Sequence, residues 1–174
     1  LPYWEGIPAD ASIGYIDSKV AELEQAFPGK KIVLAEVGWP SNGRTREAAV
    51  ASESNEAMFL RRFLARAREQ GYVYYLMEAF DQPWKAQSEG SVGAYWGVWN
   101  VDREAKFPFK APIVRIPEWR TLAAIAVALA LLLFTVFSLD GRRLATSGRS
   151  FLAVVAYATT TTVVWVLYEY SQQY

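Results

Sequence analysis

The chain has 174 residues, a formal net charge of zero, and neither cysteine nor histidine. This composition excludes thiol nucleophiles, Ser-His-Asp triads and histidine metal sites within the chain, so any catalytic acid or base must be Asp, Glu, Lys or Tyr. No basic block stands out, which argues against a nucleic-acid partner. The sequence starts at Leu1 inside a segment typical of folded structure, and we therefore expect a fragment of a longer protein.

The first 107 residues alternate between helical and strand patterns. In chain order, the patterns predict a strand end at 2–6, an amphipathic helix at 13–27, a buried strand at 32–35, a long helix at 46–70 and a strand at 72–80. A short strand or loop is expected at 95–100. Alternating strands and helices are the βαβ pattern of a parallel sheet, and each unit has about the length expected in a (β/α) barrel.

One carboxylate stands out where the strand predicted at 32–35 ends. Glu36 is followed by Gly38-Trp39-Pro40, which cannot continue a regular strand. The carboxyl ends of barrel strands carry the chemistry, and paired carboxylates with aromatic platforms are what glycoside cleavage requires. We therefore interpret Glu36 as a catalytic carboxylate. The alternative is a buried glutamate that pairs with a Lys or an Arg.

A second polar and aromatic cluster follows the strand predicted at 72–80, and it consists of Asp81, Gln82, Trp84, Lys85 and Glu89. Lys85 is a candidate for keeping Glu36 ionised, and the alternative is that Lys85 pairs only with Asp81 or Glu89.

Two tryptophans of these clusters, Trp39 and Trp84, have rings that can stack on sugar faces. Trp39 can equally pack against the end of the strand.

The stretch Lys30–Gly43, KKIVLAEVGWPSNG, closely resembles the nucleophile signature of glycoside hydrolase family 17, the β-1,3-glucanase and β-1,3-glucanosyltransferase family. That signature is an apolar strand, a small residue, Glu, one variable residue, Gly-Trp-Pro-Ser and a nearby Gly, and every element is present. The resemblance implies that Glu36 is the nucleophile of a retaining mechanism on β-1,3-glucan. It also implies the C-terminal part of a TIM (β/α)8 barrel, about three βα units, and neither a metal nor an organic cofactor.

The resemblance covers about the first 110 residues. The segment at 78–85, EAFDQPWK, is similar to the last barrel strand of the family, although Gln82 stands where many members have Glu. Together with an aromatic match near the N-terminus, it implies that the glucan cleft is lined by Tyr3, Phe80, Asp81, Lys85 and Glu89. The stacking rings of Trp39 and Trp84 complete the set of expected substrate-binding residues.

The general acid/base of the family is a Glu in an Asn-Glu pair that follows a strand. Asn55-Glu56 lies on the helix predicted at 46–70 and does not match this position. We therefore expect the acid/base upstream of this chain, and we expect the fragment alone to be inactive.

The last third of the chain has a different character. Residues 108–120 predict a semi-rigid linker, and the uncharged apolar runs at 121–139 and 151–168 are each long enough to cross a bilayer. The alternative is a buried hairpin in a soluble core. Arginines 142, 143 and 149 place the loop 140–150 in the cytoplasm by the positive-inside rule. We expect an inner (cytoplasmic) membrane protein whose domain, residues 1–107, lies on the periplasmic or extracellular side.

A family 17 domain followed by membrane helices resembles bacterial proteins that make or remodel β-1,3-glucans, some of which are fused to a membrane glycosyltransferase. The predicted function is a retaining glycosidase or transglycosylase on β-1,3-glucan. The expected partners are a β-glucan polysaccharide or oligosaccharide, the lipid bilayer and a membrane glycosyltransferase domain in the same chain. The alternatives are plain endo-hydrolysis and a non-catalytic glucan-binding or scaffolding module of a glucan synthase.

Overall fold

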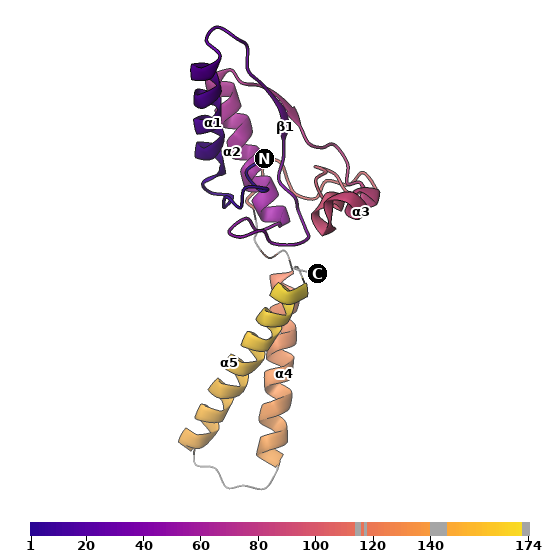
Figure 1. The fold of residues 1–174 in the computed structure, drawn as a ribbon. Helices are drawn as coiled ribbons and strands as arrows, with labels where there is room; N and C mark the ends of the chain where they lie inside the picture. The colour runs from indigo at the N-terminus through magenta and orange to yellow at the C-terminus, as the bar shows by residue number, and fades with distance from the viewer. Residues whose placement is uncertain (114–115, 117, 140–145, 172–174) are drawn as a thin grey trace. The chain divides into compact units, whose positions relative to one another are not determined.

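The computed structural model describes residues 1–113, 116, 118–139 and 146–171, and it divides into two compact units, Leu1–Arg115 and Ile116–Ser171. The regular elements of the first unit are α1 (Ser12–Ala26), β1 (Val33–Val37), α2 (Glu53–Gln70), β2 (Val73–Leu76), the 3-10 helix η1 (Pro83–Lys85), α3 (Ala86–Glu89) and the 3-10 helix η2 (Ser91–Ala94) (Figure 1). The second unit consists of α4 (Trp119–Leu139) and α5 (Thr146–Ser171).

Helices α1 and α2 pack side by side and cover one face of β1 (Figure 1). Helix α1 turns Ile16 and Val20 inward, as its apolar spacing predicted. Helix α2 is capped by Ser52, whose hydroxyl oxygen accepts the N–H of Asn55 at 3.2 Å. It ends at Gly71, which adopts the left-handed conformation with φ 71° that a helix C-cap commonly requires.

Strands β1 and β2 form a parallel two-stranded sheet with an irregular register. Leu34 pairs with Tyr74, and Val37 pairs with Leu76. The chain therefore advances three residues on β1 while it advances two on β2, which is a β-bulge. The bulge leaves Ala35 and Glu36 together opposite the one residue between Tyr74 and Leu76. As a consequence, Leu34 and Val37 both face the helices although they are three positions apart.

Strand-like pairing continues beyond the end of β2. The N–H of Glu78 donates to the carbonyl of Trp96 at 2.9 Å, and the N–H of Val98 donates to the carbonyl of Glu78 at 2.9 Å. A parallel bridge then joins Phe80 to Trp99. The segment predicted at 95–100 as a short strand or loop therefore lies beside the chain that leaves β2. Among the described residues the named strands are two, so the expected three βα units are not confirmed.

Three of the predicted elements are wrong in detail. The strand predicted at 72–80 spans only Val73–Leu76, because from Glu78 onward the backbone pairs with residues 96–99 and no longer with β1. Residues 2–6 form turns and not a strand end, with the N–H of Gly6 donating to the carbonyl of Tyr3 at 3.1 Å. The helix predicted from residue 46 begins at Glu53, because residues 46–49 close a turn through two hydrogen bonds between Arg46 and Ala49. A helix cannot include this turn, and Ser52 provides the cap after it.

The core of the first unit is rich in aromatic residues. The Tyr3 ring meets the rings of Trp39 and Trp96 edge-on at centroid distances of 5.7 and 5.6 Å. Trp39 in turn contacts Phe59 of α2, with ring centroids 5.6 Å apart. Edge-to-face pairs of this kind add to the stability from burial alone. The core therefore lies directly beneath the loop that follows β1.

The second unit is a pair of packed helices whose contact is made by small residues, Ala126, Ala130, Ala156 and Thr160. The Thr160 hydroxyl donates to the carbonyl of Ala126 on the other helix at 3.1 Å. Small residues four apart allow two helix backbones to approach closely, as in membrane helix pairs. Most of the large apolar side chains of both helices are exposed.

Both helices are long and apolar enough to cross a membrane, judged by length and composition. Helix α4 begins two residues before the predicted run at 121–139, and α5 extends the run at 151–168 at both ends. Within the predicted loop 140–150, residues 146–150 are helical, and 140–145, with two of the three arginines, lie outside the described residues.

Candidate active site

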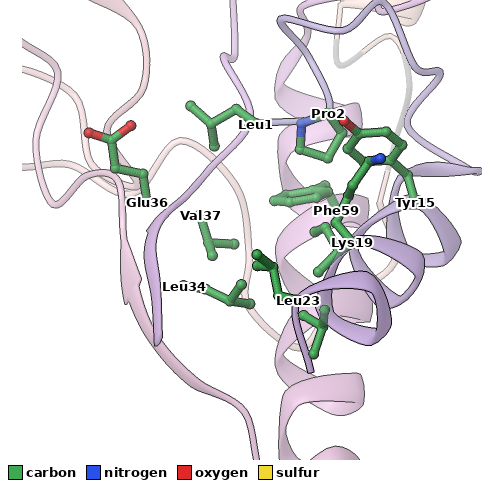
Figure 2. A pocket seen from close by; sticks show the side chains of 11 residues that line it. Leu1, Pro2, Tyr15, Lys19, Leu23, Leu34, Glu36, Val37 and Phe59 are labelled. Carbon is green, nitrogen blue, oxygen red and sulfur yellow. The ribbon is translucent and has the colours of Figure 1, made fainter. Parts of the chain in front are cut away.

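Glu36 is the fourth residue of β1 and not, as predicted, the residue after the strand. Its side chain is exposed, and the carboxylate accepts no hydrogen bond from the residues that the structure describes. Figure 2 shows Leu34 and Val37 turned toward the helices and the Glu36 carboxylate turned away from them. The β-bulge produces this orientation, because regular alternation would place Leu34 and Glu36 on one face. The alternative of a buried, paired Glu36 is thus wrong for the described residues.

The residue after Val37 has to be glycine. A Cβ on Gly38 would lie 2.0 Å from the carbonyl oxygen of Met77, and the Met77 N–H donates to the carbonyl of Val37 at 2.8 Å. Gly97 is equally restricted, since its Cβ would lie 2.1 Å from the backbone nitrogen of Asp81. Gly38 thus allows the chain after β1 to approach the backbone of Met77, and Gly97 allows its segment to approach the backbone of Asp81.

A compact polar cluster follows β2. Lys85 lies with its Nζ 2.7 Å from Oε2 of Glu78, and the Gln82 amide also donates to this oxygen. The side chains of Lys85 and Glu78 are 16% and 13% exposed, so the pair is shielded but reachable from solvent. Lys85 therefore pairs with Glu78 and not with Glu36, Asp81 or Glu89, the partners that the sequence offered. Its Nζ also lies 5.8 Å from the centre of the Trp84 ring.

Asp81 is held in the interior. Its Oδ1 accepts the N–H of Gly97 at 2.9 Å and a hydrogen bond from Nζ of Lys106 at 2.9 Å. Oε2 of Glu56 lies 3.2 Å from the same Nζ. Burial raises the pKa of the Glu56 carboxyl well above its ordinary value, although the charge of Lys106 acts in the opposite direction. Asp81 thus contributes to a buried charge cluster and does not present its carboxylate to an open cleft.

The predicted aromatic residues separate into a buried and an exposed pair. Tyr3 and Trp39 are 1% and 0% exposed. The Tyr3 hydroxyl donates to the carbonyl of Arg44, and burial raises the pKa of Tyr3. Trp39 donates through Nε1 to the carbonyl of Val50 at 3.0 Å. These two rings support the loop from below and have no free face for a sugar.

Phe80 and Trp84 form the exposed pair, at 43% and 65% exposure. The guanidinium of Arg103 lies 5.7 Å from the centre of the Phe80 ring. Glu89, the last residue of α3, is exposed as well. Among the predicted binding residues these three have exposed side chains, while Lys85 is only partly accessible.

Three residues of this region received no role from the sequence: Glu56, Glu78 and Lys106. Glu56 occurs on the apolar stripe of α2, at four- and seven-residue spacing from the buried residues Leu60 and Phe63. A charge at such a position predicts a buried partner, and this signal could have identified Glu56. No comparable pattern marks Lys106, because its three ion-pair and hydroxyl partners are distant in sequence.

A pocket lies between β1 and the helices α1 and α2, lined mainly by apolar side chains such as Ile16, Val20 and Phe59 (Figure 2). Glu36 contributes to its rim, but the carboxylate points away from it. The pocket is therefore a gap on the helix side of β1, and the Glu36 carboxylate does not face it.

Known proteins resemble part of this chain. The sequence model of the BtgE/BtgC glycoside hydrolase domain matches residues 1–97. A glucan 1,3-beta-glucosidase of Candida albicans is 30% identical over 113 residues, which cover 60% of this chain and 37% of the relative. The chain thus spans less than two-fifths of that relative.

Two solved structures from Rhizomucor miehei are similar as well. A glycoside hydrolase family 17 beta-1,3-glucanosyltransferase is 34% identical with a TM-score of 0.56, covering 60% of this chain and 38% of that chain. An active-site mutant of a beta-1,3-glucanosyltransferase in complex with laminaritriose is 33% identical with the same TM-score and coverage. These neighbours are TIM-barrel enzymes, and this chain matches 38% of the length of each.

Proposed function

The chain belongs to glycoside hydrolase family 17 through its BtgE/BtgC-type domain, and we propose that the protein cleaves β-1,3-glucan with retention, using Glu36 as the nucleophile. The observation that carries this proposal is the orientation of Glu36. The bulge in β1 turns its carboxylate out of the protein core, at the end of the strand where barrel enzymes hold their reacting groups.

In the proposed reaction, the Glu36 carboxylate attacks the anomeric carbon, and a second carboxyl group protonates the departing glycosidic oxygen. Retaining enzymes hold these two groups about 5 Å apart. Among the described carboxylates near the site, Glu78 accepts hydrogen bonds from Gln82 and Lys85, and Asp81 is bound to Lys106. We therefore propose that the acid/base comes from a part of the protein outside these 174 residues. A sugar hydroxyl or water then releases the glycosyl group from Glu36.

The exposed rings of Phe80 and Trp84 are suited to stack on glucose faces, since each offers a flat apolar surface beside polar groups. The Glu78–Lys85 pair lies in the same loop and can exchange hydrogen bonds with sugar hydroxyls. Tyr3 and Trp39 serve the site by supporting its loop. The laminaritriose complex of the Rhizomucor miehei enzyme supports a β-1,3-linked substrate.

We propose further that α4 and α5 cross a bilayer, with the first unit on the periplasmic or extracellular side of an inner membrane. At 1.5 Å per residue, helices of this length reach about 30 Å or more, which matches the hydrocarbon thickness. The chain lacks cysteine, so a single cysteine can report its location. Lys110→Cys should react with an impermeant maleimide from outside, and Ser147→Cys only after permeabilisation. The reverse pattern would invert the proposed orientation.

The nucleophile is tested in the full-length protein with a fluorinated glucosyl donor that traps the covalent intermediate. Wild type should be labelled on Glu36, and Glu36→Gln should lose the label. Glu24→Gln, an exposed carboxylate on α1, is the matched control and should keep it. Labelling that persists in Glu36→Gln would remove Glu36 from the mechanism. Products longer than the starting oligosaccharide indicate transfer, and only shorter products indicate hydrolysis. Glucan binding with neither turnover nor label would instead favour a binding module.

A further inference from the structure

Among the described cations of the first unit that form ion pairs, Lys106 has the least exposed side chain. Its side chain is 5% exposed. The Nζ atom lies 2.7 Å from Oγ of Ser41, 2.9 Å from Oδ1 of Asp81, 3.2 Å from Oε2 of Glu56 and 3.4 Å from the carbonyl oxygen of Tyr95. One ammonium group therefore contacts four oxygen atoms from four separate segments.

These segments include the two loops that carry the site. Ser41 lies in the loop after β1, five residues beyond Glu36, and the intervening residues are buried. Asp81 lies three residues beyond Glu78, in the loop after β2. Ser41 is thus joined by a short stretch of chain to Glu36, the proposed nucleophile, and Asp81 is joined in the same way to the Glu78–Lys85 pair.

Two backbone N–H groups bind oxygen atoms that Lys106 also contacts. The Ser41 N–H donates to the carbonyl of Tyr95 at 2.8 Å, and the Gly97 N–H donates to Oδ1 of Asp81 at 2.9 Å. Both acceptors are also contacts of Nζ of Lys106. Loss of the ammonium would leave two buried carboxyl groups without their cation, and the two loops would lose their common contact.

We infer that Lys106 is a positioning residue: it fixes the loop after β1 against the loop after β2 and so sets Glu36 relative to the Glu78–Lys85 pair. Lys106 does not contact the substrate, since it is buried beneath both loops. Reaction rates depend steeply on the placement of the reacting groups, and a misplacement of about 1 Å can cost about 100-fold. The catalytic part of this inference rests on the proposed function.

The test uses the full-length protein with Lys106→Met and, as control, Lys110→Met, an exposed lysine four residues further along. Covalent trapping counts the competent sites, so the turnover per trapped site is independent of how much protein is folded. Lys106→Met should lower kcat per trapped site about tenfold to 100-fold, with a smaller change in KM. Lys110→Met should leave both unchanged.

A second variant separates positioning from folding. In Glu56→Gln with Lys106→Met, one buried carboxylate is neutralised, so the thermal midpoint should recover toward wild type. The turnover per site should stay low, because Ser41 and Asp81 still lack their common contact. Recovery of the turnover together with the thermal midpoint would assign Lys106 a structural role only and overturn the inference.

Amide hydrogen exchange tests the same contact without activity. Lys106→Met should accelerate exchange at the N–H groups of Ser41 and Gly97 about tenfold or more, while Val20 in α1 is unaffected. Unchanged exchange at both amides would refute the inference. If wild type shows no covalent trapping, the proposed function fails, and the exchange measurement still decides whether Lys106 holds the two loops.

Discussion

The contact between Gly38 and Met77 allows a specific prediction for Gly38→Ala. The added Cβ would lie 2.0 Å from the Met77 carbonyl oxygen. A carbon and an oxygen in weak contact lie about 3.3–3.6 Å apart, so the two backbones would have to separate by about 1.3 Å or more. The hydrogen bond from the Met77 N–H to Val37, at 2.8 Å, would then break. Overpacking costs about 1–3 kcal/mol and a lost hydrogen bond about 1 kcal/mol, which gives about 2–4 kcal/mol of lost stability.

The same separation would displace Glu36, two residues before Gly38, and should reduce kcat/KM by about 100-fold. Denaturant unfolding and kinetics of the full-length protein measure the two effects. Gly14→Ala is the control, because Gly14 lies on α1 with no atom within 4 Å of the added Cβ, and the change should stabilise by about 1 kcal/mol. A Gly38→Ala protein within about 0.5 kcal/mol of wild type and with unchanged kcat/KM would refute this reasoning.

Two further predictions concern Glu56 and the tryptophans. Because burial raises the pKa of Glu56, the folded state binds this proton more tightly than the unfolded state. The contribution of Glu56 therefore favours folding at low pH and weakens as the pH rises from the ordinary carboxyl pKa through the raised one. Glu56→Gln should flatten the dependence of the unfolding free energy on pH, measured by denaturant titration. An unchanged pH dependence in Glu56→Gln would contradict this prediction. Trp84→Ala should weaken laminari-oligosaccharide binding about fivefold in calorimetry with little loss of stability, whereas Trp39→Ala should cost about 3–5 kcal/mol of stability. Equal effects of the two substitutions on binding and on stability would contradict the division into exposed and buried rings.

The elements that depend on local pattern were predictable from the sequence. The spacing from Ile13 onward predicted α1 within one residue at each end, and the apolar run before Glu36 predicted β1. The start of α2 was missed, because the helical period continues through residues 46–52 although a turn interrupts the backbone there. Periodicity reports which side chains are apolar and does not report where the chain reverses.

The geometry of the site was less accessible from the sequence. The direction of the Glu36 side chain depends on the bulge, which exists only in the pairing of β1 with β2. The contact of Lys106 with Glu56 joins residues 50 positions apart, and no local pattern encodes it. Lys85 was predicted to keep Glu36 ionised or to pair with Asp81 or Glu89, but its partner proved to be Glu78, which only the path of the chain after β2 brings within reach.

Most residues of the family signature that follow Glu36 pack in the protein interior. From Val37 to Ser41 every residue is buried, whereas Ala35 and Glu36 before them are exposed. Gly38 permits the close approach to Met77, Trp39 fills the core and binds the carbonyl of Val50, and Ser41 binds Tyr95 and Lys106. A motif that identifies an enzyme need not consist of residues that touch the substrate. Here one carboxylate is available for chemistry, and the residues after it hold the strand end so that this carboxylate points outward.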